Sequence, residues 1–512
     1  MTFASASTEA LCSWLAEATS LDIHSASVTI DGDDLFFVGR RGVDLVAGQA
    51  HATGSAPILR GRTQAATAPD AGDCQLTLGE ADPANASALR ARLAWLSPIP
   101  CQLAKSAGTG DRLGIATPGH IGAFEAIAQT DANGQTVHPL FPILAQQSIR
   151  ENDRTGRTPQ EVVDDAMWGV LQCGWQHGYG ADADHLKEPV DIDVCHAAGF
   201  TFFTIDPGDR VDDEANTCDM ATVQHKVAAL DWAVLDSSPT DLCEQLAGLS
   251  LDLGDRSVTL SEEDVLRAAG KYGPSLSHTV RMARHLADLC GDTPYDLEMS
   301  VDETATITSL TEHIYIGAEL QRLDVPVVSL APRYTGMFEK GVDFIGDLDE
   351  FARSWADHIA VSRHFGPYKL SLHSGSDKFS IYPIAAELGG DLIHLKTAGT
   401  SYLEAVRTIG HLDPDLMRSI LAFAVDRYPE DRQAYHVSAE LDRMDPWRTM
   451  ADRDLPSVLN DFHTRQVLHV TFGSVLNDPE LRPPFMATLR SGAAKYNELL
   501  IAHFIKHLQP FV

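Results

Sequence analysis

Short apolar runs recur along the middle of the chain, and each ends in polar residues and is followed by a stretch with helical periodicity. The runs span residues 113–117, 140–147, 180–187, 200–206, 295–303, 325–333, 368–378 and 391–400. Strand and helix signals that alternate in this way predict parallel strands, and eight such units match a closed barrel. An open doubly wound sheet gives the same alternation, but no G-x-G-x-x-G turn follows an early strand. We therefore predict an α/β fold built on an eight-stranded, TIM-type β/α barrel.

The first part of the chain does not follow this repeat. Residues 1–105 are predicted to form a small N-terminal α+β region. Alternating apolar and polar positions at 26–30 and 35–38, with an Asp-Gly-Asp-Asp turn between them, predict a hairpin. The segment 47–83 is rich in Ala, Gly, Thr and Pro, which predicts mainly loops.

Two further regions are predicted to be mostly helical. The barrel is expected at residues 106–404, and a helical insertion at 207–294 separates its fourth and fifth strands. A helical C-terminal extension is expected at 405–512, interrupted by strand-like segments at 434–438 and 467–472. No internal repeat is visible in the sequence.

Alternation along the predicted strands indicates which side chains face the inside of the barrel. Polar residues occupy one face of four strands: Thr204 and Asp206, Asp296 and Glu298, Lys369, Ser371 and His373, and His394 and Lys396. Because the outer face packs against helices and is apolar, these side chains are predicted to point inward. Barrel enzymes carry their chemistry at the C-terminal mouth, so we predict a functional site there.

Composition and charge exclude several classes of function. The chain has 39 basic and 72 acidic residues and a net charge of −33, which argues against nucleic acid as a partner. A cleft that binds an anion must therefore supply its own cations. The eight cysteines are scattered singly, without a C-x-x-C pair. Neither an apolar run long enough for a membrane span nor a basic, signal-like start is present, so we expect a cytoplasmic protein that binds no membrane.

Several motifs resemble known families. Asp184-His185 at the third strand, Glu298 at the fifth and His373-Ser374-Gly375-Ser376 at the seventh resemble the site of class II aldolases. A fuller similarity, from about residue 105 to the C-terminus, is to the tagaturonate epimerase family. It is carried by GDRLG at 110–114, AQQS at 145–148, SVDET at 300–304, KLSLHSGSDKFSIY at 369–382 and KTAGTSYLE at 396–404. The first hundred residues carry no motif of this family.

The resemblance implies that the protein interconverts D-tagaturonate and D-fructuronate, two keto-sugar acids that differ at a hydroxyl-bearing carbon β to the ketone. The hydrogen on that carbon is not acidic, so enolisation cannot invert it. Two routes to the inversion remain. One is transient oxidation by a nicotinamide, and the other is retro-aldol cleavage followed by re-addition. Since the sequence lacks a dinucleotide fingerprint, we favour the retro-aldol route.

The aldolase-like motifs imply one divalent metal ion, of the zinc or manganese type. His185 and His373 are the first predicted ligands. Class II aldolases take a further histidine after the sixth strand, and this chain has none there; Glu339 or His394 could complete the set, and we place Glu339 ahead. Asp184 is predicted to be the catalytic base, with Glu298 as its partner.

The remaining candidates would bind the substrate. Arg112, Lys187, Lys378 and Lys396 could hold its carboxylate, and each could instead have a structural role. Ser376 and Thr400, beside glycines, could donate to the same anion, and Gln147 and His394 could contact the sugar. His313, His436 and His469 are expected in the core or on helix faces.

Two other functions stay open at this stage. One is a metal-dependent aldolase that acts on a keto-sugar or sugar acid and releases its fragments. The other is a barrel subunit without catalytic activity, against which Asp184-His185 and His373 argue. The expected partner is a small keto-sugar acid, and the sequence leaves open whether the protein is a homo-oligomer.

Overall fold

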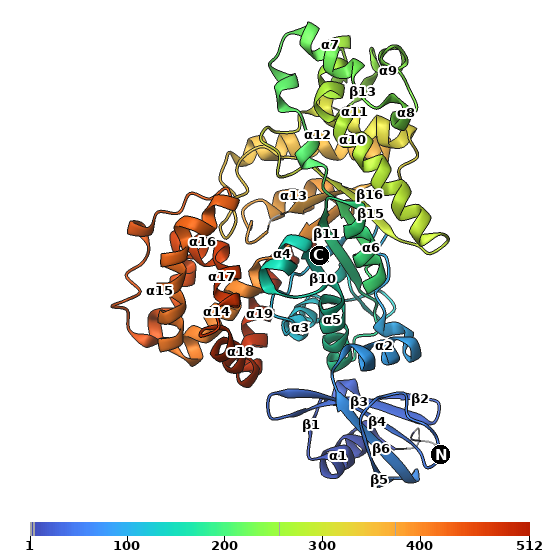
Figure 1. Ribbon diagram of the computed structural model, residues 1–512, viewed down its shortest axis with the longest axis vertical. Coiled ribbons are helices and arrows are strands. Elements are labelled where there is room, and N and C mark those ends of the chain that lie inside the picture. Colours follow the sequence, from blue (N-terminus) through green and yellow to red (C-terminus); the bar gives the residue numbers. More distant parts are fainter. Residues whose placement is uncertain (1–2, 4–5, 255, 374) are drawn as a thin grey trace.

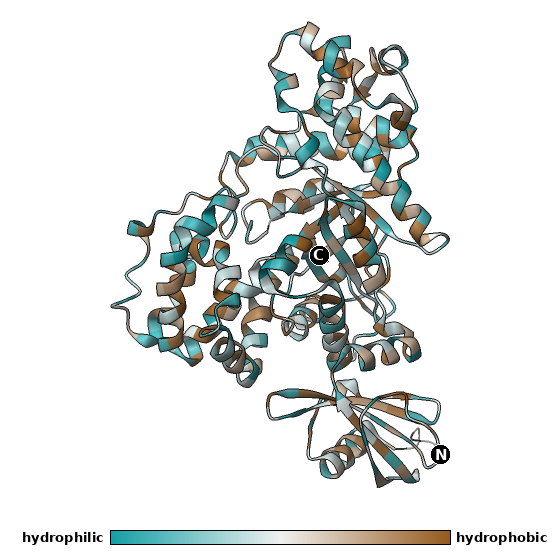
Figure 2. Ribbon diagram, in the orientation of Figure 1, coloured by the Kyte–Doolittle hydropathy of each residue, from teal (hydrophilic) through white to brown (hydrophobic). Residues whose placement is uncertain are grey.

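The computed structural model describes residues 3, 6–254, 256–373 and 375–512. Figure 1 shows a central barrel with a small N-terminal unit at one end, the inserted helices at the other and the C-terminal helices along one side. Hydrophobic and hydrophilic residues mix along each helix in Figure 2. Within the described ranges, none of the helices combines the length and apolar character needed to cross a membrane.

The centre of the molecule is a closed barrel of eight parallel strands, as predicted. Around the barrel the strands follow the order β10-β11-β12-β15-β16-β17-β18-β7. Their bounds are Ser106–Gly108 (β7), Phe141–Ser148 (β10), Gly180–Leu186 (β11), Phe202–Ile205 (β12), Asp296–Ser300 (β15), Val327–Ala331 (β16), Lys369–His373 (β17) and Ile393–Lys396 (β18). The apolar outer faces of these strands belong to one continuous core with the surrounding helices.

Helices connect most of the strands and cover the outside of the barrel. They are α3 (Thr117–Ala126), α4 (Ile149–Thr155), α5 (Pro159–Cys173), α6 (Pro189–Ala198), α10 (Glu262–Cys290), α11 (Leu310–Arg322), α12 (Leu348–Phe365), α13 (Tyr382–Gly389) and α14 (Thr400–Leu412). Capping side chains stabilise the start of many of these helices. The hydroxyls of Ser148 and Thr158 each accept a hydrogen bond from the backbone N–H of the third residue of α4 and α5. That residue is a glutamate in both helices, and its carboxylate accepts a hydrogen bond from the N-cap backbone in return, which completes a capping box.

The prediction of the first strand at 113–117 was wrong. That segment is a loop, in which the Asp111 carboxylate accepts hydrogen bonds from the backbone N–H groups of Leu113, Gly114 and Ala116, and Thr117 already begins α3. The strand that closes the barrel is β7, three small residues long. A Cβ at Gly108 would lie 2.8 Å from the Gln146 side-chain oxygen, so a larger residue there would displace the Gln146 side chain.

The N-terminal unit is a six-stranded antiparallel sheet with one helix, α1 (Thr8–Thr19), against it. Its strands are β1 (Asp22–Ile23), β2 (Thr29–Asp31), β3 (Asp34–Arg41), β4 (Asp44–Ala52), β5 (Arg62–Ala68) and β6 (Gly72–Glu80). The predicted hairpin is present as β2 and β3. The loop-rich segment is instead mostly strands, because its small residues make room: a Cβ at Gly48 would lie 2.1 Å from the ring of Phe37.

The insertion and the C-terminal extension are largely helical, as predicted. The insertion contains α7 (Met220–Ala228), α8 (Trp232–Leu235), α9 (Pro239–Leu246), the hairpin of β13 (Ser250–Asp252) and β14 (Ser257–Thr259), and α10. The extension contains α15 (Pro414–Asp431), α16 (Phe462–Val470), α17 (Phe472–Asn477), α18 (Arg482–Ser491) and α19 (Ala493–Leu508). Neither strand-like segment of the extension is a strand. Residues 467–472 lie in α16 and α17. A short buried apolar run has the same pattern in a core helix as in a core strand, which is why the prediction failed there.

Candidate active site

A small cavity opens at the C-terminal mouth of the barrel. Asp184 and His185 reach it from the end of β11, His373 from the end of β17 and Lys396 from the end of β18. The loop after β7 contributes Arg112. The polar ends of several strands thus meet at one place, as strand alternation predicted.

His185 and His373 face each other across this cavity, with ring centroids 5.2 Å apart. Asp184 lies between them, so that one ligand atom from each of the three residues lies within 4.8 Å of the others. His185 has a left-handed backbone with φ of 53°, which an L-residue adopts rarely, and the register of β11 against β12 shifts at this point. The local backbone therefore turns the imidazole into the mouth of the barrel.

Carboxylates behind the two imidazoles fix their orientation. Asp206 Oδ2 lies 3.1 Å from His185 Nδ1, and Asp302 Oδ1 lies 3.3 Å from His373 Nδ1. The other nitrogen of His373, Nε2, lies 2.8 Å from Glu298 Oε1. Two imidazoles backed by carboxylates, with a third carboxylate between them, form a donor set that suits a divalent transition metal.

Acidic neighbours control the charge of both histidines. Burial alone would lower their pKa values, but Asp184 and Asp206 together raise the pKa of His185 to about 10. For His373, burial and the Lys396 charge lower the pKa. Asp302 and, to a smaller extent, Glu298 outweigh them and raise the pKa to about 9. The acidic surroundings therefore favour positive charge at both imidazoles.

The Lys396 ammonium joins three buried carboxylates at the base of the cavity. Lys396 Nζ lies 2.9 Å from Asp182 Oδ2, 2.9 Å from Asp184 Oδ1 and 2.7 Å from Glu298 Oε1. These partners raise the pKa of Lys396 well above its usual value despite burial. Burial would raise the pKa of Asp184, but Lys396 and then the two histidines hold it below its usual range.

Asp182 differs from its two neighbours. It has no histidine beside it, so burial and the charges of Asp184 and Glu298 outweigh Lys396 and raise its pKa to about 7. The surroundings therefore favour the protonated form of Asp182 and the ionised forms of Asp184 and Glu298. Opposite preferences of this kind suit neighbouring carboxyls to the transfer of a proton.

Three further cations line the cavity. The Arg112 guanidinium stacks on the ring of Phe472 at 3.6 Å and pairs with Glu151 at 2.5 Å, while its buried Nη1 has no hydrogen-bond partner among the described residues. Arg150 Nη2 and Lys340 Nζ each lie 3.4 Å from Glu303 Oε1 and also line the cavity. The site thus supplies the local positive charge that an anionic ligand of this acidic protein requires.

Some residues of this site were not predicted. Gln146 lines the cavity, whereas the predicted Gln147 does not and faces Arg157, whose Nη1 lies 3.4 Å from Gln147 Oε1. Gln146 pairs in register with the inward-facing Asp182, so strand alternation contained the signal. Further residues that line the cavity come from helix α4 (Arg150), the loop after β16 (Lys340) and the C-terminal extension (Tyr435 and His469), and the strand pattern could not place them. His469 was expected in the core or on a helix face, and it lies in α16.

The structure does not bring Glu339 into the histidine cluster. The carboxylate of Glu339 accepts hydrogen bonds from the Ser438 hydroxyl at 2.7 Å and from the Gln466 amide at 2.7 Å. His394 faces inward but lies deeper in the barrel, where its Nδ1 lies 2.9 Å from Ser106 Oγ. The third ligand therefore stays a prediction, and these contacts do not favour either candidate.

The other predicted substrate contacts lie around the site rather than in it. Lys187 is half exposed and pairs with Asp209 at 2.6 Å. The buried Lys378 ammonium donates to the backbone carbonyls of Glu339 and Val342, and Ser376 Oγ accepts from the Gly341 N–H at 2.9 Å. Both tie the loop after β17 to the loop after β16. Thr400 is buried at the start of α14.

Comparisons with known proteins agree with the geometry. The sequence model of the tagaturonate epimerase family matches residues 25–511. The tagaturonate/fructuronate epimerase of Thermotoga maritima is 41% identical over 424 residues, which cover 83% of this chain and 84% of that protein. The native crystal structure of the fructuronate-tagaturonate epimerase from Cohnella laeviribosi is 30% identical, with a TM-score of 0.87 over 97% of this chain and 98% of that one. A glycerol complex of the same enzyme gives a TM-score of 0.86.

Proposed function

The chain belongs to the tagaturonate epimerase family and is a carbohydrate epimerase, and we propose that it interconverts D-tagaturonate and D-fructuronate by metal-dependent retro-aldol chemistry. Relatives that align over most of the chain carry these two sugar acids in their names. The observation that carries the mechanism is the cluster of Asp184, His185 and His373 beside a cation-lined cavity.

His185 and His373 are the proposed metal ligands, because their ring nitrogens lie close together at the cavity and carboxylates orient both rings. When bound there, a divalent ion would polarise the substrate ketone and stabilise the negative charge that develops as the carbon–carbon bond breaks. Each imidazole must lose its proton before it can act as a ligand.

Asp184 is the proposed base. It is ionised, it reaches the cavity, and it accepts the proton of the hydroxyl on the carbon β to the ketone. As that proton leaves, the bond between the α- and β-carbons breaks and the β-carbon becomes an aldehyde. Rotation of the aldehyde and attack by the α-carbon on its other face re-form the bond with inverted configuration, and the new alkoxide takes the proton back.

Glu298 is the proposed partner in proton transfer. It does not line the cavity, but Lys396 bridges it to Asp184 through two short contacts, of 2.7 and 2.9 Å. In this proposal Lys396 connects the two acids through its ammonium group. It does not bind the substrate carboxylate, which is the role that the sequence suggested for it. The Arg112 nitrogen without a partner, together with Arg150 and Lys340, is better placed to bind that carboxylate.

Isotope labelling tests the mechanism. The hydrogen on the inverted carbon stays attached throughout a retro-aldol reaction, so substrate deuterated there should keep its label in the product. Turnover in D₂O should add no deuterium at that carbon. Solvent deuterium at the inverted carbon would refute the route, and transfer of the label to added nicotinamide would indicate oxidation instead.

Analysis of the reaction products separates an epimerase from an aldolase. An aldolase would release free three-carbon fragments, while an epimerase should recombine them within the cavity. Removing the metal with a chelator and then restoring it should abolish and recover the epimerase activity. Full activity in a chelated, metal-free protein would show that the histidine cluster has another role.

A further inference from the structure

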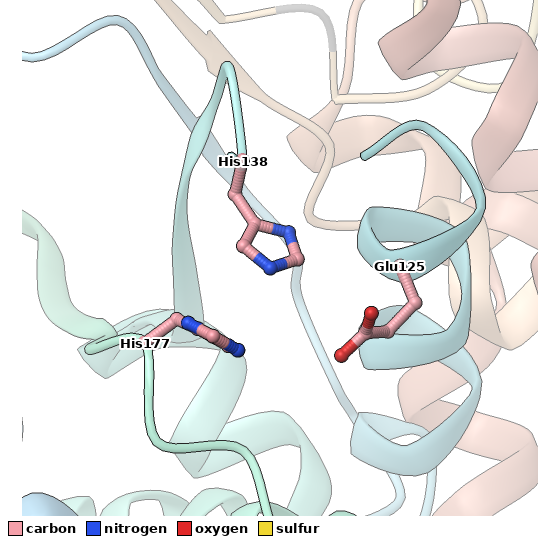
Figure 3. Close-up of side chains that lie close together, drawn as sticks. All are labelled: Glu125, His138 and His177. Atoms are coloured by element: carbon pink, nitrogen blue, oxygen red, sulfur yellow. The ribbon is translucent and has the colours of Figure 1, made fainter. Parts of the chain in front are cut away.

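A second group of metal-binding side chains lies at the other end of the barrel. Glu125 is near the end of α3, His138 lies between β9 (Thr136–Val137) and β10, and His177 lies between α5 and β11. Since both histidines precede their barrel strands, they lie at the N-terminal face, opposite the candidate active site. Figure 3 shows the two imidazoles and the carboxylate pointing toward one another from three separate segments.

The geometry of this group is close. One ligand atom from each of Glu125, His138 and His177 lies within 4.8 Å of the others. The rings of His138 and His177 have centroids 4.4 Å apart, and both contact the edge of Trp175. Trp175 is buried and held by a hydrogen bond from its Nε1 to the Gly178 carbonyl at 2.7 Å.

His138 is the residue that points to a ligand. The side chain is partly buried, its two ring nitrogens are shielded from solvent, and neither makes a hydrogen bond of good geometry among the described residues, although the Phe124 backbone lies nearby. Buried ring nitrogens that lack a good hydrogen bond destabilise the folded state, so native proteins rarely keep them without a reason.

We propose that Glu125, His138 and His177 form a second metal site, which binds a zinc-like divalent ion and has a structural role. Two imidazole nitrogens and one carboxylate oxygen are ligands that zinc accepts, and a water molecule can fill a fourth position. The ion would join α3 to the loops that lead into β10 and β11. The N-terminal face of such barrels serves stability rather than chemistry, which fits a structural role.

A third group of potential ligands already has hydrogen-bond and ion-pair partners within the protein. Asp377, His503 and His507 are also close together, but all three are buried and Asp377 already pairs with Arg465 at 2.8 Å. His503 Nε2 and His507 Nε2 both bond the same carboxylate oxygen. Hydrogen bonds and an ion pair thus fasten α19 to the loop after β17, and this cluster carries no proposal.

Metal titration in a suitable variant tests the second site. The full-length His185→Ala/His373→Ala protein lacks the proposed catalytic ligands, and we expect it to bind one equivalent of Zn²⁺ in competition with a chromophoric chelator. Co²⁺ at the same site should give the strong visible absorption of a four-coordinate ion. Adding His177→Ala, a change at an exposed residue, should weaken Zn²⁺ binding at least a hundredfold, whereas the matched change His436→Ala, at an exposed histidine far from the cluster, should not.

Independent readouts complete the experiment. Zn²⁺ should raise the melting temperature of the His185→Ala/His373→Ala protein, and this increase should disappear when His177→Ala or Glu125→Gln is added. Circular dichroism verifies that each variant is folded. Absence of stoichiometric Zn²⁺ binding in the folded His185→Ala/His373→Ala protein would overturn the proposal, as would binding that survives His177→Ala. Neither outcome depends on whether the catalytic proposal is correct, because the catalytic ligands are absent.

Discussion

Single residues at the barrel mouth differ mainly in which charge lies beside them. Asp182 and Asp184 are two positions apart on β11 and both contact the Lys396 ammonium at 2.9 Å. Only Asp184 also lies near His185 and His373, and its pKa is lowered while the pKa of Asp182 is raised to about 7. Opposite pKa shifts in neighbouring acids are typical of sites that transfer protons.

Replacing Asp184 tests its role as the base. Asp184→Asn keeps the shape of the side chain but cannot accept a proton, so kcat should fall by about 10²–10⁴. Metal content should stay unchanged if His185 and His373 are the ligands. Kinetics and metal analysis on the same preparation measure both quantities. Loss of the metal together with activity would show instead that Asp184 is itself a ligand.

Replacing Arg112 tests recognition of the substrate carboxylate. Arg112→Lys keeps a cation for Glu151 but removes the buried Nη1 that has no protein partner. A lost charge-assisted hydrogen bond costs roughly 1.5–3 kcal/mol, so KM for the keto-sugar acids should rise about ten- to a hundredfold. The neutral ketohexose, assayed as substrate or competitive inhibitor, serves as the control. An equal loss for both sugars would show that Arg112 does not read the carboxylate.

Much of the candidate site could be predicted at this scale. Alternation within a strand placed Glu298, His373 and Lys396 inside the barrel, because a residue's face depends only on its own strand. Depth along the barrel axis could not be predicted in the same way. Asp296 and Lys369 also face inward, yet they bond the loop at Cys101 near the opposite end of the barrel.

At the scale of elements, buried polar groups fix how helices pack on the barrel. The helices α11 and α12 meet at a pair of buried imidazoles, with His313 Nδ1 and His358 Nδ1 2.7 Å apart. The other nitrogen of His313 lies 2.9 Å from the Tyr368 hydroxyl. Burial lowers the pKa of His358 to about 4 and that of His313 well below its usual value, so both rings are neutral in the folded protein.

This pair predicts sensitivity to acid. In the unfolded chain each imidazole takes up a proton near pH 6.5, whereas folded His358 does so only near pH 4, so stability is lost as pH falls from about 6.5 to 4. His358→Gln removes one group that takes up a proton on unfolding. The free energy of unfolding of the variant should therefore fall less steeply with pH than that of the unchanged protein, and the two slopes should differ by about 1.4 kcal/mol per pH unit. Urea unfolding at several pH values measures both slopes. Parallel slopes for the two proteins would contradict the assignment.

The sequence could predict elements only where periodicity was strong. Seven of the eight barrel strands coincide with predicted apolar runs, but β7 is only Ser106–Gly108 and has no run to detect. Its place in the barrel is set by its neighbours, since β10 and β18 pair with it on either side. Short strands of small residues therefore depend on tertiary context, which a local pattern does not contain.

At the scale of the whole molecule, acidic charge is unbalanced. With 72 acidic and 39 basic residues, 33 acids have no opposite charge in the chain to offset them. Many of the cations are already used in ion pairs, including the buried ones at the candidate active site. The remaining acids repel one another across the surface, and this repulsion opposes the compact state.

Salt should therefore stabilise this protein. Raising the salt concentration shortens the Debye length from about 10 Å at 0.1 M to about 3 Å at 1 M, which screens repulsion between distant surface acids. The same screening weakens exposed ion pairs, but each of these contributes only about 0–1 kcal/mol, and close or buried pairs are screened least. Relief of repulsion among the excess acids should dominate, so the melting temperature should rise steadily with KCl. Differential scanning calorimetry measures it, with sucrose at matched water activity as the control for effects other than screening. A melting temperature that falls with KCl, or rises no more than it does in sucrose, would show that paired charges outweigh the excess acids.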